Sequence, residues 1–189
     1  KRRLGKLMEH DFLIANKSYE QFFEDVISPE EFAELKREPA TEYLKECLKE
    51  DILSADVKYE KFCKDVISLE EFAELKREYS IKYLQSLYLE DFFLAEKVYK
   101  EDFFELVTKE DLVRVKRIAA PSFLQELLTN NGSQYTDNIY YKYFDGIISK
   151  AEYLRFKVPN LKKWFKENLP DWHRIPDEDQ LCAIADNLG

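Results

Sequence analysis

Few residues of this 189-residue sequence could carry out chemistry, and their spacing matches no reactive pattern that we tested. The two histidines, His10 and His173, lie near opposite ends of the chain, and neither has a neighbour at metal-ligand spacing. Nucleophile elbows, phosphate loops and dinucleotide-binding turns need closely spaced glycines, and the chain has only 4 glycines in all. We therefore expect no catalysis, no metal or other cofactor, and no small-molecule ligand.

Three aspartates, Asp25, Asp65 and Asp145, could be mistaken for parts of calcium loops. A calcium loop supplies oxygen ligands at alternate positions over about twelve residues, with glycine at the sixth position and glutamate at the twelfth. Here each aspartate is followed directly by Val-Ile or by Gly-Ile-Ile, so too few oxygens can converge. The sequence argues against a calcium site.

The net charge of −9 lies in the middle of the chain. Residues 28–67 carry 7 Lys/Arg and 11 Asp/Glu, and residues 68–107 carry 5 and 10. Because a phosphate backbone binds to positive surfaces, nucleic acid is disfavoured as a partner. No run of 18 apolar residues could span a membrane, and no signal-peptide core follows the basic N-terminus. The chain does not begin with Met, so we expect a fragment of a longer protein.

An internal repeat of about 40 residues positions all other features. The segment Ser28–Glu38 (SPEEFAELKRE) recurs as Ser68–Glu78 (SLEEFAELKRE), and weaker copies begin at Thr108 and Ser149. Tyr, Val and Ala residues between these segments recur at the same offsets. The copies predict an all-α fold, either a right-handed α-solenoid or a stack of helical hairpins. The units are 1–27 (partial), 28–67, 68–107, 108–148 and 149–169 (partial), followed by a capping segment at 170–189.

Each copy carries a helix-start signal. Ser28, Ser68 and Ser149 stand three residues before a glutamate, which is the spacing of a capping box, and Thr108 precedes Asp111 in the same way. Apolar residues before each cap and four residues after it predict a hydrophobic staple. First helices are expected at 29–37, 69–78, 109–118 and 150–157. Prolines then predict a break, followed by second helices at 41–50, 81–90, 121–129 and 160–168. Third helices are expected at 6–26, 53–66, 92–106 and 134–145.

The cysteines are predicted to be reduced core residues. Their number is odd, and Cys47, Cys63 and Cys182 share no CxxC spacing, which favours the cytoplasm or nucleus over an oxidising compartment. Cys47 and Cys63 align with Leu87 and Phe103 of the next copy, so their positions accept large apolar side chains. A last helix is expected at 178–187, with Asp177 as its cap.

One stretch resembles a known helical module. The order Ala15, Phe23, Val26, Glu30-Glu31-Phe32 and Leu35 recurs as Ala55, Cys63, Val66, Glu70-Glu71-Phe72 and Leu75. This order resembles the central helices of the BACK domain of BTB/Kelch ubiquitin-ligase adaptors. The resemblance implies a scaffold that supports cullin binding and spaces a substrate domain.

The repeat favours a non-enzymatic scaffold or adaptor that binds another protein. The alternative is an acidic regulator or effector that binds a basic protein surface or mimics nucleic acid. Phe104 replaces charged residues of the other copies and is a candidate contact, whereas Phe93 is expected in the core. A basic face on the last copy supplies the other candidate contacts, Arg155, Lys162 and Lys163.

Overall fold

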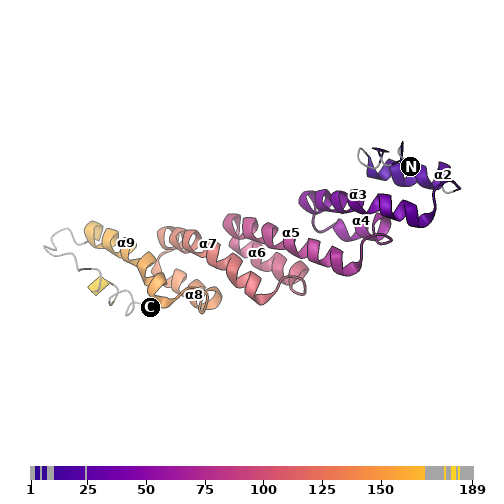
Figure 1. The fold of residues 1–189 in the computed structure, drawn as a ribbon. Helices are drawn as coiled ribbons and strands as arrows, with labels where there is room; N and C mark the ends of the chain where they lie inside the picture. The colour runs from indigo at the N-terminus through magenta and orange to yellow at the C-terminus, as the bar shows by residue number, and fades with distance from the viewer. Residues whose placement is uncertain are drawn as a thin grey trace. The chain divides into compact units, whose positions relative to one another are not determined.

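The computed structural model describes residues 3–4, 6–7, 11–23, 25–168, 177, 180–181 and 183. In these residues the chain is all-helical, as the sequence predicts, and contains no β-strand. Long helices alternate along the chain with shorter ones (Figure 1). The elements are α2 (Phe12–Phe22), α3 (Pro29–Glu50), α4 (Ala55–Phe62), α5 (Leu69–Glu90), α6 (Phe92–Val98), the π-helix η1 (Tyr99–Phe103), α7 (Lys109–Asn130), α8 (Ser133–Tyr143) and α9 (Lys150–Asn168).

The chain divides into two compact units. The first comprises Lys1–Lys82 with Asp102–Val107, and the second comprises Tyr83–Glu101 with Thr108–Gly189. In the first unit α3 packs against both α2 and α4. In the second unit α7 packs against α8 and α9. Each unit is therefore built on a long helix that carries shorter or neighbouring helices.

Capping boxes are present at Ser28, Ser68 and Ser149 as predicted, and at the weaker cap Thr108 Oγ1 accepts from the Asp111 amide at 3.2 Å. The Glu31 amide donates to Ser28 Oγ at 3.2 Å, and the Ser28 amide donates to Glu31 Oε2 at 3.3 Å. The same reciprocal pair joins Ser68 to Glu71 and Ser149 to Glu152. Hydrogen bonds from the cap lower the pKa of the Glu71 and Glu152 carboxyls, so each box is strongest with an ionised glutamate.

A tyrosine clamp closes the turn before each of three long helices. The hydroxyls of Tyr19, Tyr59 and Tyr140 donate to the carbonyls of the residues eight positions later, at 3.2, 3.1 and 3.0 Å. Each ring also stacks on an aromatic ring in the first turn of the long helix, with centroids 3.6, 4.2 and 4.1 Å apart. The partner rings are Phe32, Phe72 and Tyr153. The clamp fixes the angle between each short helix and the long helix that follows it.

The helix breaks predicted at the prolines are absent. Pro39, Pro121 and Pro159 lie inside α3, α7 and α9, so each predicted first and second helix is one continuous helix. In α3 the buried positions run past Pro39 at steps of four: Phe32, Lys36, Ala40, Leu44 and Leu48. Burial of this stripe outweighs the one backbone hydrogen bond that a proline removes.

The predicted third helices end two to four residues early, and α2 begins at Phe12 rather than at residue 6. The carbonyls of Tyr59 and Tyr140 each accept a bond from the amide five residues later, at 3.1 and 3.0 Å, and the corresponding Tyr99 begins η1. Such π-type bonds widen the helix and lead into a turn. The expected break at Asn130-Asn131-Gly132 is confirmed, with Gly132 in the left-handed region at φ 79°.

The C-terminal capping segment lies mostly outside the described residues, including Trp172, Ile184 and Cys182. Its predicted cap is present: the Gln180 amide donates to Asp177 Oδ1 at 2.9 Å. Leu181 is fully buried against Val158 and Phe165 of α9. This contact places Leu181 against the helix of the last copy.

Replacing Pro39 with alanine should raise the stability of the chain. The change restores a backbone donor inside a continuous helix, and we expect about 1 kcal/mol or more in urea denaturation. Tyr79 is the aligned residue of α5, so Tyr79→Pro is the reverse control and should cost about 3 kcal/mol. A loss of stability in Pro39→Ala would contradict a continuous α3.

Candidate functional site

A lysine recurs at one position of every long helix and is withdrawn from solvent. The residues are Lys36, Lys76, Lys116 and Lys157. Lys36, Lys116 and Lys157 are 5%, 8% and 2% exposed, and Lys76 is half-buried. An ammonium group in such a place is stable only beside a carboxylate. These lysines are therefore candidate site residues.

In three copies the carboxylate comes from the preceding short helix, twenty residues earlier. Lys76 pairs with Asp56, Lys116 with Glu96, and Lys157 with Asp137. The Lys157 amino group lies 2.9 and 3.0 Å from the two Asp137 oxygens. Each pair thus joins a short helix to the long helix that follows it.

Tyrosines complete two of these pairs. Tyr88 donates to Glu96 Oε1 at 2.7 Å, and Tyr153 donates to Asp137 Oδ1 at 2.6 Å. Burial first, and the hydrogen bond to a carboxylate second, raise the pKa of both tyrosines. The hydroxyls therefore stay protonated and act as donors within the fold.

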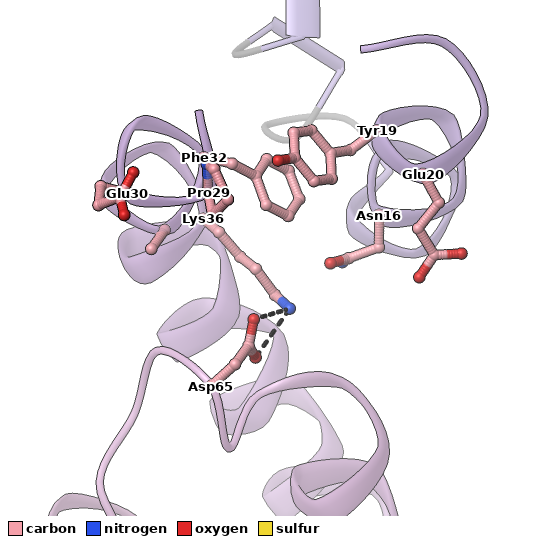
Figure 2. A pocket seen from close by; sticks show the side chains of 9 residues that line it. Asn16, Tyr19, Glu20, Pro29, Glu30, Phe32, Lys36 and Asp65 are labelled. Atoms are coloured by element: carbon pink, nitrogen blue, oxygen red, sulfur yellow. Dashed lines mark hydrogen bonds and ion pairs between the residues drawn. The ribbon is translucent and has the colours of Figure 1, made fainter. Parts of the chain in front are cut away.

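The first copy departs from this arrangement. The position of Asp56, Glu96 and Asp137 is taken by the neutral Asn16, and the Lys36 amino group instead donates to both oxygens of Asp65, at 2.9 and 2.8 Å. A cavity of about 480 Å³ opens between α2 and α3 at this place. Figure 2 shows the Asn16 side chain extending from α2 toward the Lys36–Asp65 pair.

The walls of this cavity, which we call the Lys36 pocket, combine rings with charges. Its lining comprises Asn16, Tyr19, Glu20, Pro29, Glu30, Phe32, Ala33, Lys36 and Asp65. The Lys36 amino group also lies 5.8 Å from the centre of the Phe32 ring and 6.0 Å from that of Phe12. Asp65 is 54% exposed, whereas Lys36 is buried. The pocket thus presents the buried ammonium group of Lys36, whose counter-ion Asp65 is about half exposed to water.

Apolar residues at the start of α2 and α6, and in the turn before α4, form a second candidate feature. Consecutive apolar pairs recur as Phe12-Leu13, Ile52-Leu53 and Phe92-Phe93. The first residue of each pair is buried (7%, 4% and 2% exposed), and the second is exposed (40%, 51% and 44%). On α6 the Phe92 ring stacks on Phe123 of α7 with centroids 4.4 Å apart, whereas the Phe93 ring meets Phe123 only edge-on at 5.8 Å and stays exposed. The expectation that Phe93 belongs to the core is therefore wrong.

The predicted contact residues lie on different parts of the chain. Phe104 is 63% exposed, directly follows η1 and belongs to the first unit. The basic candidates share α9 of the second unit, where Arg155 and Lys163 are exposed and Lys162 is half-buried. Arg155 and Lys162 are seven residues apart and so lie on one helix face. Lys163 is 4.0 Å from Glu167, so part of that positive charge is compensated.

The aligned lysines and Asn16 were not among the sequence candidates. Their signal was nonetheless present, because the copies align Lys36, Lys76, Lys116 and Lys157 without exception. The alignment also sets Asn16 against three acids. A comparison of charge, and not only of apolar replacements, between copies identifies both.

Within the described residues, no group of three or more His, Cys, Asp or Glu side chains could hold a metal ion. None of the described helices combines the length and apolarity needed to cross a bilayer. Comparison with models of known protein families, with curated proteins and with solved structures found no match for this chain.

Removing the carboxylate from a buried pair should destabilise the fold strongly. Asp137→Asn leaves the Lys157 charge buried without an anion, and we expect a loss of about 3–5 kcal/mol by urea denaturation. The matched control Glu46→Gln removes the acid of the exposed pair with Lys49 and should cost less than about 1 kcal/mol. Adding Lys157→Met to Asp137→Asn should restore much of the loss. Equal losses for Asp137→Asn and Glu46→Gln would contradict this view of the pair.

Cys63 should be protected from alkylation in the folded chain. It is fully buried, and burial raises the pKa of its thiol to about 12. At pH 8 we expect iodoacetamide to modify Cys63 at least about tenfold more slowly than the half-buried Cys47, measured by peptide mass spectrometry. Since folding favours the neutral thiol, its contribution to stability is complete below pH about 8.5 and is lost as pH rises through 12. Equal rates at pH 8 would show that Cys63 is accessible.

Proposed function

We propose that this chain is a non-enzymatic scaffold or adaptor whose helical copies stack as an α-solenoid or as helical hairpins and bind another protein. The observation that carries the proposal is the recurrent exposure of the second residue in each apolar pair, at Leu13, Leu53 and Phe93. Single exposed apolar residues are common on protein surfaces. Exposure at the same position of three copies instead favours a contact surface.

The polar contacts between helices support a binding role over catalysis. The three lysine–acid pairs and the tyrosine clamps use their charges and hydroxyls to hold short helices on long ones. The BACK-like order of residues would make a ubiquitin-ligase adaptor one form of this function. The buried, unpaired thiol of Cys63 suits a reducing compartment, such as the cytoplasm or nucleus.

The acidic-regulator alternative rests on a groove of the first unit. Glu71, Glu74 and Glu78 line a cavity of about 320 Å³ together with Arg37 and Thr41. These glutamates are three and four residues apart and therefore share one face of α5. Such a face suits a basic protein surface, and a contact of this kind weakens with salt.

A pull-down at low and high salt separates the two functions. An immobilised chain should retain a partner in both salts if apolar contacts dominate, and only at low salt if the glutamates dominate. Recovery of a cullin-type ligase at both salts would favour the adaptor form. Retention of no protein at either salt would contradict both functions.

Leu53→Glu should lower the affinity for the retained partner at least about tenfold, because it places a charge in the recurrent apolar position. Val57→Glu is the matched control: Val57 is 67% exposed, and the aligned residues of the other copies are polar. The two variants can be compared by titration of the partner identified in the pull-down. Equal effects of the two variants would contradict a contact through the apolar positions.

A further inference from the structure

We propose that the Lys36 pocket binds the carboxylate of an Asp or Glu side chain of a partner protein, flanked by basic residues. This inference rests on the proposed protein-binding function and names the partner chemistry at one place on the surface. It is based on the replacement of an acid by Asn16 in the first copy, at a position where the other copies have Asp or Glu.

The other copies show what occupies the equivalent place. Beside Lys76, Lys116 and Lys157, a carboxylate of the short helix reaches the ammonium group. In the first copy the short helix offers Asn16 instead, and the cavity lies there. The fold therefore positions a lysine for a carboxylate that α2 does not supply.

The pocket offers hydrogen-bond donors to an incoming oxygen. A lysine ammonium carries three N–H groups, and Lys36 directs two of them at Asp65. Within the described part of the chain, the third meets no acceptor. Asn16 uses one amide N–H on the Phe12 carbonyl at 2.8 Å, which leaves its second N–H for a ligand. A carboxylate can accept from both side chains at once.

The charges at the rim determine the source of the carboxylate. The lining includes three carboxylates, those of Glu20, Glu30 and Asp65, and in Figure 2 only Asp65 is joined to Lys36 by dashed lines. Together with the net charge of −9, they repel a small free anion. A carboxylate flanked by Lys or Arg on a protein avoids this repulsion, because the flanking cations face the rim glutamates while the acid reaches Lys36.

The test uses the whole chain and three short peptides that are acetylated at the N-terminus. The first has a central Glu between lysines and an amidated C-terminus, and the second has Gln in place of Glu. The third has the central Gln and a free C-terminal carboxylate. Binding is followed by amide chemical shifts of Ala33 and Lys36 on titration. The Glu peptide should bind at least about tenfold more tightly than either Gln peptide.

Two variants with the same added charge locate the binding. Asn16→Asp supplies the missing acid from α2, as in the other copies, and should weaken the Glu peptide at least about tenfold. Gln21→Glu adds the same charge at an exposed position of α2 and should change the affinity less than about twofold. Lys36→Met should abolish the preference for Glu over Gln, and its circular dichroism should match that of the unmodified chain.

Three results would overturn the proposal: equal affinity for the Glu and amidated Gln peptides, equal or tighter binding of the free-carboxylate peptide, or equal weakening by Asn16→Asp and Gln21→Glu. Any of them would leave the proposed function standing if the pull-down retains a partner whose binding is sensitive to Leu53→Glu. Loss of partner retention with intact peptide binding would instead contradict the proposed function alone.

Discussion

A lysine ammonium taken out of water needs a carboxylate beside it, and this requirement shapes the contact between short and long helices. Lys116 on α7 and Glu96 on α6 are both about nine-tenths buried, so neither can lose the other without leaving a buried charge. The same holds for Lys157 and Asp137. Because the two members of a pair come from different helices, the charge requirement also fixes how those helices pack.

Apolar packing and polar contacts cooperate at the same joints. The tyrosine clamp closes the turn, the capping box starts the long helix, and the lysine–acid pair locks the short helix on its side. A buried ion pair adds little net stability but penalises a wrong partner. Burial of apolar side chains therefore supplies the stability, and each pair adds a contact that only an acid on the short helix can make.

The first copy is the exception, because its short helix supplies no acid to the aligned lysine. With Asn16 in the acid position, Lys36 turns to Asp65, which is half in water, and space opens beside the ammonium group. The exposed second residue of each apolar pair is a separate feature, since it is apolar and involves no charged group. Together they are the apolar and the polar contact that we propose for a partner protein.

The sequence was sufficient to predict the helical class, the capping boxes and the confirmed break at Gly132, because these depend on local spacing. It failed at Pro39, where the local penalty of proline is smaller than the burial of the stripe around it. It also failed for Phe93, because the sequence does not show which of two adjacent apolar residues packs more deeply. The lysine–acid pairs needed knowledge of which helices pack together, although the alignment of copies already contained their residues.

A double-mutant cycle on Lys116 and Glu96 tests the role of the buried pair most directly. The chain, Lys116→Met, Glu96→Gln and the double variant are compared by urea denaturation. The account predicts a coupling energy of about 1.5–3 kcal/mol, with the double variant more stable than Glu96→Gln alone. A coupling energy within about 0.3 kcal/mol of zero would show that the pair does not hold α6 on α7.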